Sequence, residues 1–136
     1  MHQHIMFVCT SCASAHRTKQ AIRVSGGDRL LEQLQVLHRD SPLQAELSIQ
    51  PVECLSACKQ DCTIALIGAD KPTYLFGDLP VEDELEATAV AVLEFAKQYH
   101  ARADGSISYI KCPELLKKRI LAKVPPMPGI NAGKSN

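Results

Sequence analysis

Apolar and polar positions divide the first hundred residues into four short strands and two long helices. The run HIMFVC at residues 4–9 is short and apolar, which is typical of a buried strand. Residues 25–40 carry apolar side chains at helical spacing: Leu30, Leu31, Leu34 and Leu37. We expect Gly26 and Gly27 to break the chain before this helix and Asp28 to cap it.

Three further strands are expected between the two helices. The stretch LSIQPVE at residues 47–53 alternates apolar and polar positions, and Pro51 favours an edge position or the end of a strand. CTIALIG at 62–68 and TYLFGDL at 73–79 follow. They are separated by ADKP, a connection whose length favours a hairpin.

The second helix is expected over residues 80–102. Pro80 stands at its start, and four early acidic residues favour a helix N-terminus. Its buried stripe is predicted to consist of Leu85, Ala89, Val92, Leu93, Ala96 and Tyr99. The order strand, helix, strand, strand, strand, helix indicates an α/β fold with a four-stranded mixed sheet and two main helices.

The length of the chain bounds its organisation. With 46% hydrophobic residues, 136 residues can bury one ordinary core. We expect one domain at 1–104 and a basic extension at 105–136, in which a short amphipathic helix follows Pro113. The first residues lack the pattern of a secretory signal, and no apolar run approaches the roughly 20 residues of a membrane span. A cytoplasmic protein with reduced thiols is therefore expected.

Charge is balanced overall but unevenly spread along the chain. Residues 111–136 contain six basic residues and one acidic residue, so the body is mildly acidic and the tail basic. A basic tail can attract nucleic acid or an acidic partner, but with 4% aromatic residues and no Trp there is no stacking platform for bases. A solvated tail, or one that packs on the body, is favoured.

Four cysteines fall in two loops that the predicted topology brings together. Cys9 and Cys12 lie at the end of the first strand, and Cys54 and Cys58 lie between the second strand and the third. If the first two strands are parallel and joined by a helix, both loops leave the same end of the sheet. Four thiolates suit a zinc site or an iron-sulfur cluster. The alternative is that these cysteines are small apolar residues of the core.

The chain also resembles a known family. HIMFVCTSC, a helix, then VECLSACKQDCTIALIGADKPTYLFGDL and a closing helix resemble the thioredoxin-like 2Fe-2S ferredoxins over roughly residues 4–100. The sequence is more similar still to a group of uncharacterised bacterial proteins described as predicted metal-binding. The most specific element is the C-x-x-x-C segment CLSAC at residues 54–58.

This resemblance implies a thioredoxin-like fold and a 2Fe-2S cluster. In the ferredoxins an N-terminal cysteine pair and a C-x-x-x-C pair bind the cluster, so Cys9, Cys12, Cys54 and Cys58 carry over as ligands. The first pair here is a tight C-x-x-C, whereas the ferredoxins usually have a longer spacer. Cys62 stands near where they tend to have glycine and proline. Zinc therefore stays open as the alternative metal.

The other cysteines and His16 are weaker candidates. Cys62 leads into an apolar strand, and it could be a core residue, a spare ligand or a resolving thiol. Cys112 stands alone before a proline, which favours a structural role. His16, four residues after Cys12, is the best histidine candidate for an additional ligand.

The remaining histidines are expected to have no role at the metal. His2 and His4 belong to the opposite end of the first strand from Cys9, and we expect both to be solvated. His38 and His100 lie near the ends of the two helices, where the helix dipole favours a protonated imidazole.

Three functions are compatible with these features. The first is a small electron carrier with a 2Fe-2S cluster; the second is a zinc-binding or metal-delivery protein; the third is a thiol-disulfide oxidoreductase that uses Cys9 and Cys12. Against the third, no Trp precedes Cys9, and Cys54 and Cys58 would have no purpose. An electron carrier or a metal-binding protein needs a protein partner that handles electrons or metal. A membrane partner is not expected, and a homodimer is compatible with the sequence.

Overall fold

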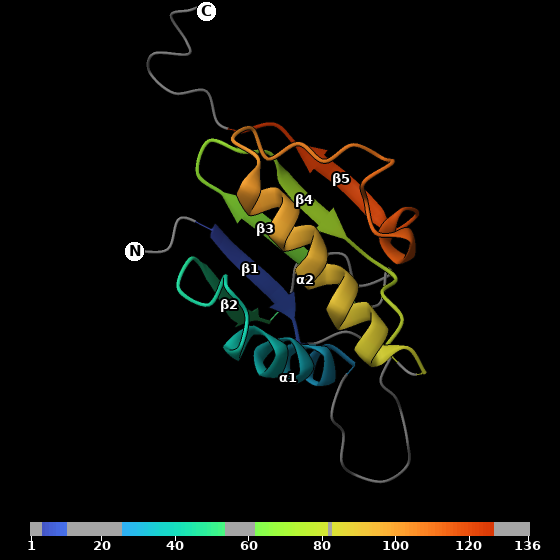
Figure 1. The fold of residues 1–136 in the computed structure, drawn as a ribbon. Coiled ribbons are helices and arrows are strands. Elements are labelled where there is room, and N and C mark those ends of the chain that lie inside the picture. The colour runs from blue at the N-terminus through green and yellow to red at the C-terminus, as the bar shows by residue number, and fades with distance from the viewer. Residues whose placement is uncertain (1–3, 11–25, 54–61, 82, 127–136) are drawn as a thin grey trace, which may run out of the picture.

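A mixed sheet of five strands forms the centre of the molecule, in the order β2-β1-β3-β4-β5 (Figure 1). The computed structural model describes residues 4–10, 26–53, 62–81 and 83–126. The strands are β1 His4–Cys9, β2 Leu47–Val52, β3 Ile64–Gly68, β4 Thr73–Phe76 and β5 Ile120–Val124. β1 is parallel to β2 and antiparallel to β3, and β4 is antiparallel to both of its neighbours. The predicted mixed sheet, the β3–β4 hairpin and the edge position of β2 with its Pro51 are confirmed.

The fifth strand corrects the predicted count of four. Beyond Pro113 the chain forms only a 3-10 turn, η2 Glu114–Leu116, where a short amphipathic helix was expected, and then β5. β5 pairs with β4, with Thr73 opposite Val124 and Leu75 opposite Ala122. Only this pairing identifies the segment as a strand, because its partner lies more than forty residues earlier in the sequence. The basic segment is therefore partly built into the sheet.

The two long helices differ from prediction at their starts. α1 spans Gly26–Arg39, so Gly26 and Gly27 belong to the helix, and the prediction that they break the chain is wrong. α2 spans Leu85–Ala101 and begins five residues after Pro80. The Thr88 hydroxyl donates a hydrogen bond to the Pro80 carbonyl at 2.6 Å, which ties the approach segment to the first turn.

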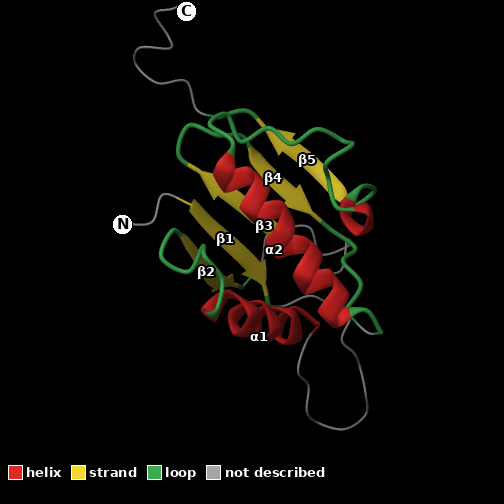
Figure 2. Cartoon of the chain, in the orientation of Figure 1, coloured by secondary structure: helices red, strands yellow, loops and turns green. Residues whose placement is uncertain are grey.

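Both helices pack on one face of the sheet, as Figure 2 shows from that side. Met6 and Val8 pair across the sheet with Leu66 and Ile64, and the same rows continue to Tyr74 and Phe76 on β4. Because alternate residues of a strand point to opposite faces, these side chains share one face. They form a single core with buried residues of α1 and α2: Leu30, Leu34, Ala89, Ala91, Val92, Leu93, Phe95, Ala96 and Tyr99. The predicted stripe of α2 is confirmed, except that Leu85 is only partly buried.

Among the described residues, no helix is both long enough and apolar enough to cross a membrane.

Candidate metal centre

Cys9 lies at the end of the sheet where β1 and β2 finish and β3 begins. It pairs with Val52, the last residue of β2, and its N–H donates to the Thr63 carbonyl at 3.1 Å. Its thiol donates to the Glu53 carbonyl, with Sγ 3.7 Å from the oxygen. Cys9 is therefore in contact with the residue before Cys54 and with the residue after Cys62. The parallel pairing of β1 and β2 confirms that both loops leave the sheet at the same end.

The start of α1 lies closer to the Cys9 backbone than a side chain at Gly27 would allow. A Cβ on Gly27 would lie 1.9 Å from the Cys9 carbonyl oxygen and 3.1 Å from Thr10 Cα. Only glycine fits such a distance, so the start of α1 packs directly on the backbone that carries Cys9. Sequence reasoning missed this role, although a glycine pair at the start of a helical pattern was its signal.

Cys62 lies on the other side of the sheet from Cys9. It is 1% exposed and belongs to the core beneath the helices, and its carbonyl accepts a hydrogen bond from Leu79 N–H at 3.3 Å. Cys9 follows the core residue Val8 in β1, so strand alternation directs it to the opposite face. The burial of Cys62 supports the core role among the three that the sequence left open.

Cys112 lies in the segment that leads from α2 to β5, and β5 is separated from the strand of Cys9, β1, by β3 and β4. It is 5% exposed and belongs to the same core. Burial raises the pKa of its thiol, and Glu114 adds to this effect while Lys117 opposes it. A buried, protonated thiol fits the structural role that the sequence favours.

The other predicted ligands lie outside the described residues. Cys12 and His16 fall within 11–25, and Cys54 and Cys58 fall within 54–61. His2, which we expect to be solvated, precedes β1 and also lies outside the described residues. Within the described part of the chain, no group of three or more His, Cys, Asp or Glu side chains could hold a metal. The four-cysteine site thus stays a prediction. The strands that precede its two loops, β1 and β2, end at the same end of the sheet.

A buried polar cluster lies at the opposite end of the sheet from Cys9, where β1 begins. His4 and Lys71 are each 8% exposed. Lys71 Nζ donates to His4 Nε2 at 3.0 Å, to the Tyr99 carbonyl at 2.8 Å and to the His100 carbonyl at 3.2 Å. These acceptors match the three N–H groups of an ammonium. The expectation that His4 is solvated is wrong, because its register opposite Gly68 places it beside the turn that carries Lys71.

The titration of this cluster follows from its burial. Burial lowers the pKa of His4, and the charges of Lys71 and His100 lower it further. Burial also lowers the pKa of Lys71 and raises that of Tyr99 to about 12. His4 is therefore neutral and able to accept the Lys71 hydrogen bond, while its buried Nδ1 has no hydrogen-bond partner among the described residues.

Comparison with known proteins places the chain in a family. Residues 6–126 match the family described as "Protein of unknown function (DUF1636)". The chain belongs to this family. The matched span includes all six cysteines and β5. No curated protein matches the chain.

A solved structure supports the fold. The thioredoxin-like [2Fe-2S] ferredoxin from Aquifex aeolicus superposes with a TM-score of 0.54, covering 93% of this chain and 96% of that one. The two sequences are 14% identical, so this likeness shows the fold alone. The DUF1636 chain therefore has an α/β thioredoxin-like fold, as the sequence predicts.

Proposed function

We propose that this DUF1636 protein holds a 2Fe-2S cluster on Cys9, Cys12, Cys54 and Cys58 and serves as a small cytoplasmic electron carrier. The observation that carries the proposal is the contact between the Cys9 thiol and the carbonyl of Glu53, the residue before Cys54. The likeness to a thioredoxin-like [2Fe-2S] ferredoxin adds support from the fold.

Chain connectivity limits how far the proposed ligands can lie from this contact. Cys54 follows Glu53 directly, and Cys12 follows Thr10 by two residues, with Thr10 N–H bonded to the Val52 carbonyl at 3.0 Å. Since each residue spans at most about 3.6 Å, both pairs begin within a few ångströms of one hydrogen-bonded contact. Two cysteine pairs tethered this closely can reach a common centre.

The donor set suits iron and sulfide. Four thiolates are the usual ligands of a 2Fe-2S cluster, and their mutual repulsion is relieved only when a metal binds. When bound, such a cluster accepts and releases one electron. The residues of this chain would fix the cluster between the two loops, with Gly27 allowing the start of α1 to support the backbone of Cys9.

The thiol-disulfide oxidoreductase alternative is less well supported. A reactive thiol needs partial exposure, whereas Cys9 is 5% exposed and its Sγ lies within hydrogen-bonding distance of a backbone carbonyl. Zinc would use the same four sulfurs in a closed tetrahedral site, so the identity of the metal is the quantity to measure.

Anaerobic purification tests the proposal directly. We expect a coloured protein with visible charge-transfer bands, iron and acid-labile sulfide at two each per chain, and an EPR signal after reduction with dithionite. A colourless protein with one zinc per chain would replace the electron carrier by the zinc-binding alternative. A metal-free protein after reconstitution with either metal would contradict both.

Serine variants identify the ligands. Cys54→Ser or Cys58→Ser should lose most of the bound metal, because a hard oxygen replaces a soft thiolate in a closed site. Cys112→Ser is the matched control and should keep its metal. Cys62→Ser should also keep its metal but lose about 1–3 kcal/mol of stability if the buried hydroxyl lacks a partner. Loss of metal from Cys62→Ser alone, with Cys54→Ser unaffected, would show that the wrong cysteine was chosen.

A further inference from the structure

An apolar groove with an acidic rim runs along α2. It lies between α2 and the segment Pro113–Leu115 and has a volume of about 670 Å³. Ala87, Val90 and Ala91 of α2 form one wall, and Pro113 and Leu115 form the other. Val90 is 52% exposed, although most of its apolar neighbours on α2 are buried. The groove therefore leaves an apolar surface uncovered.

The charged residues that line the groove are all acidic. Its charged lining residues are Glu86, Glu94 and Glu114. Glu114 is paired with Lys117, whose Nζ lies 3.2 Å from the carboxylate. Glu86 and Glu94 have no ion-pair partner among the described residues and are exposed. The groove thus has two carboxylates available to a cationic partner.

The spacing on α2 defines the pattern that a partner must match. Glu86, Val90 and Glu94 follow one another at four-residue intervals, which places them about 6 Å apart along the helix. An acidic, apolar, acidic stripe is complementary to a second helix that carries a basic, an apolar and a basic residue at the same spacing.

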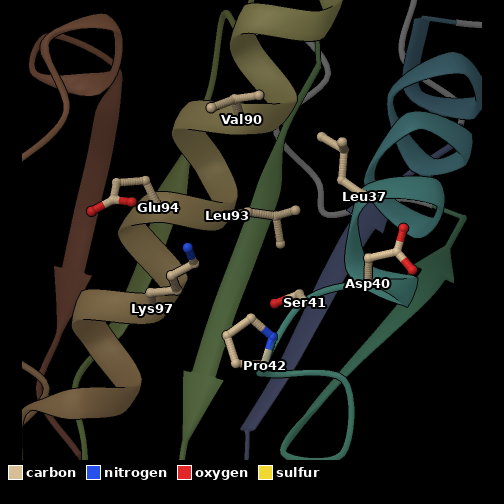
Figure 3. A pocket seen from close by; sticks show the side chains of 8 residues that line it. All are labelled: Leu37, Asp40, Ser41, Pro42, Val90, Leu93, Glu94 and Lys97. Carbon is tan, nitrogen blue, oxygen red and sulfur yellow. The ribbon is translucent and has the colours of Figure 1, made fainter.

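A neighbouring groove lacks this single sign. The groove between α1 and α2 is smaller, about 260 Å³, and its lining includes both Asp40 and Lys97 (Figure 3). Figure 3 shows Leu93 directed toward α1 and Glu94 directed away from it. Val90 and Glu94 line both grooves, whereas Glu86 lines only the groove beside Pro113–Leu115.

Two further exposed apolar residues precede Pro113 in the sequence. Tyr109 is 63% exposed and Ile110 is 84% exposed. Gln98 of α2 donates to the Lys111 carbonyl at 2.8 Å, and Lys117 Nζ lies 4.8 Å from the centre of the Tyr109 ring. The Gln98 hydrogen bond ties this segment to α2.

The groove lies toward the same end of the molecule as Cys9. It is lined by the first half of α2, and Leu79, six residues before α2, is hydrogen-bonded to the Cys62 carbonyl. The tip of β1 and the start of α2 lie at the same end in Figure 1. The groove nevertheless lies on the β5 side of the sheet, whereas the two cysteine loops follow β1 and β2, so a partner seated here shares one end of the molecule with those loops without lying against them.

We propose that this groove docks a helical segment of a protein partner in which an apolar residue stands between two Lys or Arg residues at four-residue spacing. Docking itself does not depend on a cluster, whereas its use for electron transfer rests on the proposed function. The two unpaired carboxylates, Glu86 and Glu94, oppose nucleic acid and anionic membranes as occupants.

Helical peptides provide the test. The probe is a fluorescein-labelled, lactam-stapled peptide with the pattern Lys-x-x-x-Leu-x-x-x-Lys, and the controls replace both Lys by Glu or the Leu by Ser. We expect saturable binding of the first peptide by fluorescence anisotropy, weaker binding of both controls, and lower affinity at higher salt. Equal binding of the Lys and Glu peptides would overturn the proposal.

Variants of the protein locate the binding site. Glu86→Lys with Glu94→Lys should weaken binding of the Lys peptide about tenfold and improve binding of the Glu peptide, because two attractions become repulsions. Val90→Ser should weaken both. The matched control, Glu32→Lys with Asp40→Lys, makes the same charge change on α1 and in the other groove and should leave affinity unchanged. If the control weakens binding as much, the groove is wrongly assigned.

Two further measurements separate this proposal from its alternatives. A concentration-dependent dimer on gel filtration that the Glu86→Lys, Glu94→Lys variant abolishes would assign the groove to a second copy of the chain and overturn the proposal. Measuring peptide binding in metal-free and reconstituted protein separates docking from the cluster. Binding in both samples supports the groove even if the metal is zinc or absent.

Discussion

At the scale of residues, the candidate centre depends on how tightly the backbone is packed around Cys9. The Cys9 thiol contacts the Glu53 carbonyl, and its own carbonyl lies against Gly27. Neither contact involves a charged side chain. The position of the cysteine is therefore set by backbone packing, which a single methyl group can disturb.

Gly27→Ala tests this packing. Alanine is the better helix former by about 1 kcal/mol, so a glycine with open space around it would gain stability on substitution. Here the added Cβ would meet the Cys9 carbonyl, and we expect a net loss of about 1–3 kcal/mol in urea denaturation, together with lower metal content. Gln35→Ala, an exposed change on the same helix, is the control and should stay within about 0.5 kcal/mol of wild type. A more stable Gly27→Ala protein would contradict the close approach.

At the scale of elements, the segment after α2 completes both the sheet and the core. β5 pairs along β4, the Tyr74 hydroxyl accepts a hydrogen bond from Ile107 N–H at 3.1 Å, and Leu116 is fully buried. Without this segment, β4 would present an open edge and the core would lose Cys112 and Leu116. The predicted division at residues 104 and 105 stays a prediction, and these contacts lead us to expect that residues 105–126 fold together with the body.

Two truncations test that boundary. A chain of residues 1–126 keeps every described contact and should unfold at the same temperature as the full chain. A chain of residues 1–104 loses β5 and two core residues, and we expect it to lose at least about 3 kcal/mol, since four paired positions of the ladder contribute about 1 kcal/mol each. Circular dichroism melting measures both. A 1–104 chain as stable as the full chain would show that residues 105–136 are an independent extension.

At the scale of the whole molecule, Lys71 joins three parts that are far apart in the sequence. Its ammonium bonds His4 at the start of β1 and two carbonyls at the end of α2, and it stands itself in the β3–β4 turn. Gly105, with φ of +67°, packs on the Lys71 side chain, where a Cβ would lie 2.7 Å away. This cluster therefore fastens the end of the sheet opposite Cys9.

This cluster predicts that acid destabilises the protein through His4. The pKa of His4 is lowered in the folded protein, so below about pH 6.5 the unfolded chain binds a proton that the folded chain resists. Stability should fall as the pH drops below that value, by up to about 1.4 kcal/mol per pH unit until the folded pKa is reached, and His4 should contribute no slope above it. Glu46 opposes this effect by favouring the proton, whereas Lys71 and His100 strengthen it.

His4→Gln isolates this contribution, because glutamine keeps an acceptor for Lys71 but does not titrate. We expect urea unfolding of wild type and His4→Gln to differ by an amount that changes between pH 5 and 6.5 and is constant from pH 7 to 8. Gln35→Ala, an exposed change that involves no titratable group, is the control and should give a difference that does not vary with pH. A His4→Gln difference that does not vary with pH would show that His4 is protonated equally in the folded and unfolded chains.

The sequence by itself determined the elements whose signals are local. Apolar spacing identified α1 and the buried stripe of α2, and the ADKP turn between two apolar runs identified the hairpin. Pro51 marked an edge strand, because proline has no N–H to donate and an inner strand is hydrogen-bonded to a neighbour on each side. The same signals predicted that the two cysteine loops leave one end of the sheet, since a helix between two adjacent strands makes them parallel.

Tertiary structure alone decided the features that depend on distant partners. Residues 120–124 became a strand because β4 offered an open edge, and Gly27 entered a helix because that helix lies against Cys9. His4 is buried because Lys71, 67 residues later, lies beside it. The local pattern of these residues does not identify the backbone that each of them meets. Their environment follows from which backbones meet, and local periodicity carries no information about that.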